Sequence, residues 1–387
     1  MPKSSAILVF CILLFSGFAC FSQDSIKTAK DTITFSGQAC VWGNYNIKNA
    51  LPLQFGGHYI PNLDYGILFP KDKKLDFEVS LNFNGSLTFH PLDSLHTIGS
   101  VAPYRAWMRF SARQWEVRAG LQKINFGSAT LLRPLMWFDQ VDPRDPLQLT
   151  NGAWGLLFRY YFLNNANLWF WGLYGNKMPR PWDIGKTNQE FPELGCRLQT
   201  PVPKGEIALT YHFRVADMRN LGITVPALFE IPENRIGLDA KWDLGAGIWF
   251  EGAWINKSKM TGLLTNQEIF NIGVDNTFGI GNGLTMVFEQ LLVANDEHAF
   301  AFSNNILFSA LSLSYPIGMS DNINGIIYFE WKNKKSYNFI NWNHKFNYFS
   351  TYLMAYWNPE TYSLPQQGNS GSSYSGPGIQ VMLVYNH

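Results

Sequence analysis

Long stretches of this chain alternate between apolar and hydrophilic residues. In residues 76–90 the odd positions are almost all Phe, Val or Leu, whereas the even positions hold Asp, Glu, Ser, Asn, Thr and His. Residues 206–214 and 235–244 repeat the pattern. A period of two indicates a β-strand with one apolar and one polar face. Strands usually stop at about five or six residues, whereas strands of about ten match the length that crosses a bilayer. The alternation therefore predicts an all-β chain that forms a transmembrane antiparallel β-barrel.

The connections between these segments also alternate in length. Short ones at residues 113–114, 163–166, 200–205, 244–247 and 279–283 separate long ones at 124–151, 177–191, 216–234, 256–267 and 333–344. Outer-membrane barrels have this asymmetry, with short turns at one end and long loops at the other. A secreted β-sandwich or propeller, which composition leaves open, has no reason to sort its loops in this way.

The number of strands is constrained by closure. The chain contains 17 or 18 candidate strands, depending on whether residues 307–315 form one strand or part of two. A single-chain bacterial barrel needs an even number, so we expect 18 strands, with 16 as the alternative. The last strand, residues 378–385, places Ile379, Val381, Leu383 and Tyr385 on one face.

Composition is compatible with a barrel that has one face in lipid. Only 15% of the residues are charged, against an average of about 25%, and 16% are aromatic. Beyond the N-terminal segment, no apolar run reaches the roughly 20 residues that a transmembrane helix needs. The formal net charge of +1 gives no general attraction to nucleic acid.

The N-terminal segment predicts export. Lys3 precedes an apolar stretch at residues 6–18, and cleavage after Ser22 would remove a signal peptide of residues 1–22. Residues 23–387 would then form the barrel in the bacterial outer membrane. The alternative is a lipoprotein acylated at Cys20, which Gly17 disfavours because a branched apolar residue is usual there. Cys40 and Cys196 would remain, too few and too far apart for a disulfide framework.

Residues 104–123 read as a hairpin with charged side chains on one face. Its polar positions are Arg105, Arg109 and Arg113 on the first arm and Glu116, Arg118 and Gln122 on the second. An arginine facing lipid costs about 2–4 kcal/mol at the bilayer midplane, so these side chains are predicted to line the lumen. There they would attract small polar or anionic solutes through bidentate arginine contacts. The alternative is a structural ladder in which the arginines pair with carboxylates.

The next connection contains a stiff, charged stretch, residues 133–146, with three prolines. Its ionisable residues are Arg133, Asp139, Asp142, Arg144 and Asp145. Trp137 and Phe138 would be costly to leave in water, so we predict that this loop folds into the lumen as a constriction, with Arg144 held by one of the aspartates. The alternative is an outward cap on the rim. Calcium at Asp142 and Asp145 is disfavoured by the arginine between them.

Signatures of catalysis and of cofactor binding are weak. His212 with Asp217 and His344 with Asn341 are the nearest candidates for a hydrolase, and neither pair lies in a catalytic pattern. The chain shows no glycine-rich phosphate loop and no zinc-ligand spacing. We therefore expect neither an enzyme nor a metal or cofactor.

The stretch at residues 118–127, Arg-Ala-Gly-Leu-Gln-Lys-Ile-Asn-Phe-Gly, with Arg133-Pro134 and Asp-Pro-Arg-Asp-Pro at 142–146, resembles porin-like outer-membrane proteins of the Bacteroidetes, akin to alginate-export barrels. Residues 353–359 and 378–382 are similar to the ends of such proteins. The resemblance implies passive or facilitated passage of small polar solutes or oligosaccharides, without fixing a substrate or an oligomeric state. The alternative is a plugged barrel with a structural or polysaccharide-binding or export role.

Overall fold

Antiparallel strands make up most of the chain that the computed structural model describes, namely residues 31–48, 52–89, 95–222, 225–360 and 374–387. The strands are β1 (Thr32–Asn46), β2 (Leu53–Phe69), β3 (Lys73–Phe89), β4 (Leu95–Ser111), β5 (Trp115–Gln122), β6 (Ala153–Tyr161), β7 (Asn167–Leu173), β8 (Lys186–Thr187), β9 (Glu193–Val202), β10 (Gly205–Asp217), β11 (Glu230–Asp243), β12 (Gly247–Lys257), β13 (Asn266–Phe278), β14 (Leu284–Asp296), β15 (Asn305–Pro316), β16 (Asp321–Glu330), β17 (Lys335–Lys345), β18 (Phe349–Trp357) and β19 (Pro377–Asn386). Two 3-10 turns, η1 (Arg219–Leu221) and η2 (Pro226–Leu228), lie between β10 and β11.

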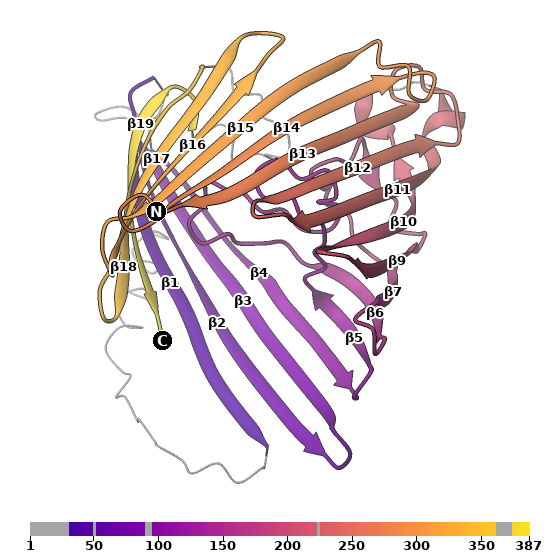
Figure 1. Ribbon diagram of the computed structural model, residues 1–387, viewed down its shortest axis with the longest axis horizontal. Helices are drawn as coiled ribbons and strands as arrows, with labels where there is room; N and C mark the ends of the chain where they lie inside the picture. Colours follow the sequence, from indigo (N-terminus) through magenta and orange to yellow (C-terminus); the bar gives the residue numbers. More distant parts are fainter. Residues whose placement is uncertain (1–30, 49–51, 90–94, 223–224, 361–373) are drawn as a thin grey trace, which may run out of the picture. The chain divides into compact units, whose positions relative to one another are not determined.

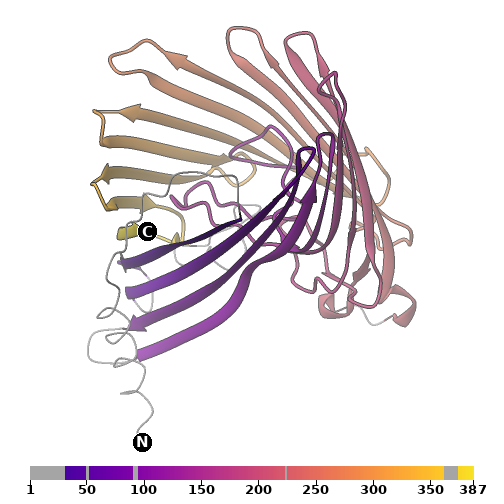
Figure 2. The same ribbon diagram turned by 90° about the horizontal axis from the view of Figure 1, so that it is seen from below.

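Successive strands pair with one another, and the first strand pairs with the last. Gln38 on β1 lies opposite Ile60 of β2 and opposite Asn386 of β19. The two-residue β8 lies in the connection between β7 and β9 and adds a short pairing to the end of β10. The other eighteen strands form a closed antiparallel ring (Figures 1 and 2), which confirms the predicted barrel and its strand number.

The two faces of the strands follow the alternation in the sequence. On β10, Leu209 and Tyr211 are 56% and 40% exposed, whereas Thr210, His212 and Arg214 are completely buried. The predicted apolar face of β19 is likewise the exposed one. An apolar exterior around a hydrophilic interior is the arrangement of a barrel whose outer surface is covered by lipid.

The connections are sorted by end, as predicted from their lengths. Residues 70–72, 112–114, 162–166, 203–204, 244–246, 279–283, 317–320 and 346–348 form the turns at the end where β1 begins and β19 finishes. The opposite end carries the long connections, above all residues 123–152 and 174–192.

One predicted loop is wrong. Residues 333–344 fall largely within β17, and the connection before it is only residues 331–334. The strand was hidden because its interior face carries Asn341 and Asn343 beside Tyr337 and Phe339, which breaks the contrast between faces. Residues 307–315, whose division was left open, belong to the single strand β15.

Some predictions concern features outside the strands. The predicted signal peptide, residues 1–22, lies outside the described residues. Cys40 and Cys196 are free thiols. Within the described ranges, no helix has the length and apolarity needed to span a membrane.

Candidate functional site

The connection between β5 and β6, residues 123–152, lies inside the barrel. Figure 2 shows it as the purple chain within the curve of the strands. Leu135, Met136, Trp137 and Phe138 are at most 2% exposed. Leu135, Trp137 and Phe138 share one hydrophobic cluster with interior side chains of β12 to β18, such as Ile269. Burial of these side chains accounts for the inward fold, because each large apolar group contributes about 1.5–3 kcal/mol when it leaves water.

Two carboxylates on the opposite wall bind the backbone of this loop. Glu289 on β14 accepts hydrogen bonds from the backbone N–H groups of Thr130 at 2.7 Å, Leu131 at 3.1 Å and Leu132 at 2.6 Å. Glu251 on β12 accepts from the N–H of Ala129 at 2.7 Å. Buried backbone donors need such partners, since leaving one unpaired costs about 1–3 kcal/mol.

Gly127 allows the loop to approach Glu251. Its φ of +96° lies in the left-handed region, and an added Cβ would lie 2.3 Å from Oε1 of Glu251. A side chain at this position would therefore conflict both with the backbone conformation and with the carboxylate.

The charged stretch of the loop satisfies most of its own charges. Arg144 donates from Nε to Oδ1 of Asp142 at 2.8 Å. Asp145 accepts from the backbone N–H groups of Leu147 at 3.0 Å and Leu149 at 3.2 Å. Arg133 lies 3.5 Å from Asp139, which is 1% exposed. Burial raises the pKa of Asp139, although Arg133 and Lys123 act in the opposite direction.

On the β4–β5 hairpin the arginines surround carboxylates. Arg109 donates to Asp76 of β3 at 2.8 Å. Glu116 has three arginines within 4 Å: Arg159 at 3.2 Å, Arg109 at 3.7 Å and Arg118 at 3.8 Å. These arginines and carboxylates therefore pair as in the structural ladder that was the alternative prediction for the hairpin. Within this ladder the side chain of Arg109 remains 28% exposed toward the interior.

The other predicted hairpin residues have different surroundings. Arg105 donates hydrogen bonds to the carbonyl and the hydroxyl of Thr150 at 3.1 and 2.5 Å. It therefore holds residues 143–152, the returning arm of the loop that leads into β6, against the wall. Gln122 is buried and donates to the backbone carbonyls of Arg118 and Gly155. Arg113 does not share the interior face, because β4 ends at Ser111 and this exposed side chain lies in the turn.

A second charged network was not predicted as a site. The connection at residues 174–192 also enters the barrel, where Asp183 contacts Arg214 at 3.1 Å and Arg235 at 2.5 Å. Glu233 lies 2.6 Å from each of these arginines. The alternation places Arg214 and Arg235 on the hydrophilic faces of their strands, but nothing local to them points to Asp183.

The histidines do not form the candidate catalytic pairs. His212 contacts Glu193 on the neighbouring strand β9 at 3.2 Å and Trp171 on β7, one strand further, at 3.2 Å. His344 lies 2.8 Å from Asp321. Within the described part of the chain, no group of His, Cys, Asp and Glu side chains could hold a metal ion.

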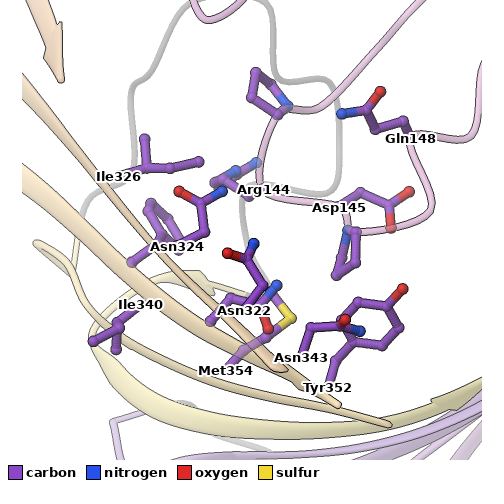
Figure 3. A pocket seen from close by; sticks show the side chains of 14 residues that line it. Arg144, Asp145, Gln148, Asn322, Asn324, Ile326, Ile340, Asn343, Tyr352 and Met354 are labelled. Atoms are coloured by element: carbon purple, nitrogen blue, oxygen red, sulfur yellow. The ribbon is translucent and has the colours of Figure 1, made fainter. Parts of the chain in front are cut away.

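Two cavities border the returning arm of the loop. The first, about 230 Å³, lies between Arg144, Asp145 and Gln148 and the wall formed by β16 to β18. Figure 3 shows Asn322, Asn324 and Tyr352 projecting from that wall toward the loop. The second cavity, about 470 Å³, lies between Leu147 and Leu149 and the strands β1 to β4, with Glu78 and Tyr104 among its lining.

Comparison with solved structures gives the same fold. The chain is similar to OmpF of Salmonella typhi, in a structure with daunomycin, with a TM-score of 0.51 at 9% identity over 94% of this chain and 99% of that one. It is also similar to OccAB4 of Acinetobacter baumannii, with a TM-score of 0.50 at 11% identity over 92% and 98%. No protein-family model matches the sequence, and no curated protein matches it. The closed eighteen-stranded barrel, its apolar exterior and these shared folds together make the chain a bacterial outer-membrane β-barrel protein.

Proposed function

We propose that the barrel is a porin-like channel for passive or facilitated passage of small polar solutes. The observation that carries this proposal is the pair of cavities on the two sides of residues 143–149, both lined largely by polar side chains. The inward loop narrows the interior without occupying these two spaces. The similarity of residues 118–127 and 142–146 to porin-like proteins of the Bacteroidetes supports the same function.

The arginine-bearing wall is proposed to contact the solutes. Arg109 remains partly exposed, and Arg118 lies over the ring of Trp107 at 4.6 Å, which keeps its guanidinium in place. Anionic solutes would gain charge-assisted hydrogen bonds from these groups. Glu116 and Asp76 limit the preference for anions, because they already neutralise part of the positive charge.

The alternative is a plugged barrel with a structural or polysaccharide-binding role. The observation in its favour is the continuous hydrophobic cluster between the loop and the walls, which includes Leu132, Trp137, Leu291 and Tyr356. If the loop fills the lumen through this cluster, with Glu251, Glu289 and Arg105 binding it to the wall, no path for ions remains.

Planar-bilayer recording of the purified protein in concentrated KCl tests the proposal. We expect discrete conductance steps from the wild type and larger steps when residues 135–147 are deleted. Detergent carried through the same purification without the protein is the control. A folded wild-type barrel that gives no steps contradicts the channel and supports the plug.

The deletion separates the role of the loop from that of the barrel. If wild type and deletion variant show equal conductance, residues 135–147 do not form a constriction, although the barrel still conducts. Heat-modifiable migration on gels verifies that each variant is folded.

A further inference from the structure

The strand side of the first cavity is built from amide groups. Asn322 and Asn324 on β16 and Asn341 and Asn343 on β17 line it together with Tyr352 on β18. Among the strand residues that line this cavity there is no carboxylate, ammonium or guanidinium group. This wall therefore differs in chemistry from the β4–β6 wall, where arginines and carboxylates alternate.

The charged groups on the loop side are already engaged. The guanidinium of Arg144 binds Asp142 and lies over two rings that contact each other, 5.0 Å from that of Phe339 and 4.8 Å from that of Tyr374. Asp145 is bound by two backbone N–H groups. One guanidinium beside two carboxylates gives this side a net negative charge, so a solute carboxylate entering the cavity would meet repulsion.

The amides retain capacity for hydrogen bonds with a solute. A primary amide offers two donors and an acceptor with two lone pairs. Asn322 bonds to Ser314, and Asn324 accepts from Ser312 at 3.1 Å. Oδ1 of Asn341 is enclosed and has no hydrogen-bond partner among the described residues. A hydroxyl group that both donates and accepts matches this set better than an ion does.

We propose that this cavity is a binding site for a neutral polyhydroxylated solute of about one sugar ring. Its volume of about 230 Å³ is below the roughly 300–1,000 Å³ of sites for drug-sized ligands. Asn322, Asn324 and Asn341 would exchange hydrogen bonds with hydroxyl groups, while Ile326 and Met354 would cover the C–H surface of the ring. The inference rests on the proposed channel, because the solute reaches the cavity through the lumen.

Ligand-observed saturation-transfer NMR on the detergent-solubilised full chain tests this site with two probes. Glucose and glucuronate differ at one carbon, where a hydroxymethyl group is replaced by a carboxylate. At low ionic strength we expect glucose to bind more tightly than glucuronate. The double variant Asn322→Ala/Asn324→Ala should bind glucose about tenfold more weakly, the effect of about two lost neutral hydrogen bonds. Asn84→Ala, an exposed asparagine on β3 that lines neither cavity, is the matched control and should bind like the wild type.

Two results would overturn the inference. One is equal or tighter binding of glucuronate, which would favour the arginine wall as the recognition surface. The other is unchanged glucose binding in the folded double variant. Because this measurement needs no ion flow, a barrel that conducts without binding glucose contradicts the site alone, whereas one that binds glucose without conducting contradicts the channel alone.

Discussion

Glu289 accepts a 2.6 Å hydrogen bond from the backbone N–H of Leu132, a residue 157 positions earlier in the chain. Through this bond a connection that leaves the barrel wall at β5 is held against β14. The loop tip, residues 130–132, pairs with no strand. The carboxylate of Glu289 therefore accepts the backbone hydrogen bonds that a neighbouring strand would otherwise accept. The position of the loop inside the barrel therefore depends on individual side chains of the opposite wall, such as Glu289 on β14.

Replacing Glu289 by Ala should release the loop tip. The change leaves three backbone N–H groups without their acceptor, and bonds to a charged group contribute about 1.5–3 kcal/mol. We expect the free energy of unfolding to fall by about 3 kcal/mol and residues 127–138 to become more sensitive to protease. Urea unfolding followed by tryptophan fluorescence measures the first effect. Glu297→Ala, at an exposed position, is the control, and equal losses in the two variants would contradict the role of Glu289.

Gly127 and Gly175 form a matched pair. Both have positive φ, +96° and +75°, but an added Cβ meets Glu251 only at Gly127, and at Gly175 it meets nothing within 4 Å. Gly175→Ala should cost about 1–2 kcal/mol of backbone strain. Gly127→Ala should cost clearly more, because Glu251 must also move. Thermal unfolding of the two variants checks this difference, and similar losses would show that the loop accommodates the methyl group.

Removing the carboxylate among the three arginines should change the ion preference. In Glu116→Gln, Arg109, Arg118 and Arg159 lose a shared counter-charge, and we expect the reversal potential in a KCl gradient to shift toward anions. Arg109→Ala/Arg118→Ala should shift it toward cations. The control, Glu206→Gln, removes the same charge from β10, outside the hairpin, where Glu206 accepts a hydrogen bond from Gln199 at 2.6 Å. If Glu206→Gln shifts the reversal potential as much as Glu116→Gln does, the charges of the β4–β5 hairpin have no particular effect on ion selectivity.

The raised pKa of Asp139 predicts how stability depends on pH. Because its pKa in the folded protein lies above the ordinary value of 3.8, the folded protein binds this proton more tightly than the unfolded chain does. Asp139 therefore lowers stability at neutral pH, and this loss disappears as the pH falls through the raised pKa to below 3.8.

Asp139→Asn should consequently be more stable than the wild type at neutral pH. The advantage should shrink steadily as the pH is lowered toward 3.8. Urea midpoints of both proteins across this range measure it. Asp243→Asn, at an exposed position on the edge of a turn, serves as the control. An advantage that is independent of pH would assign the effect to packing and not to ionisation.

The barrel was predictable because lipid imposes one simple condition on every strand. Leu209 and Tyr211 face outward and Arg214 inward because only apolar side chains are stable against the bilayer. This condition did not reveal β17 in the sequence, because the interior face of β17 is itself partly aromatic. It also says nothing of Arg113, which lies just beyond the end of its strand.

The interior was less predictable, because its contacts join distant segments. The prolines and aromatic residues of the loop indicated that it is stiff and apolar, but neither Glu251 nor Glu289 carries a local sign that it binds backbone. The same holds for Asp183, whose partners Arg214 and Arg235 lie on strands further along the chain. A pattern of period two shows which side chains face inward and contains no information about their partners.

The pairing of β1 with β19 has a consequence for incomplete chains. A chain that lacks residues 377–386 would present two open edges, one on β1 and one on β18. In hydrocarbon each unpaired backbone group costs several kcal/mol, and exposed edges pair with other chains. Truncation at the C-terminus should therefore give aggregation and proteolytic clearance in the periplasm, not a smaller barrel.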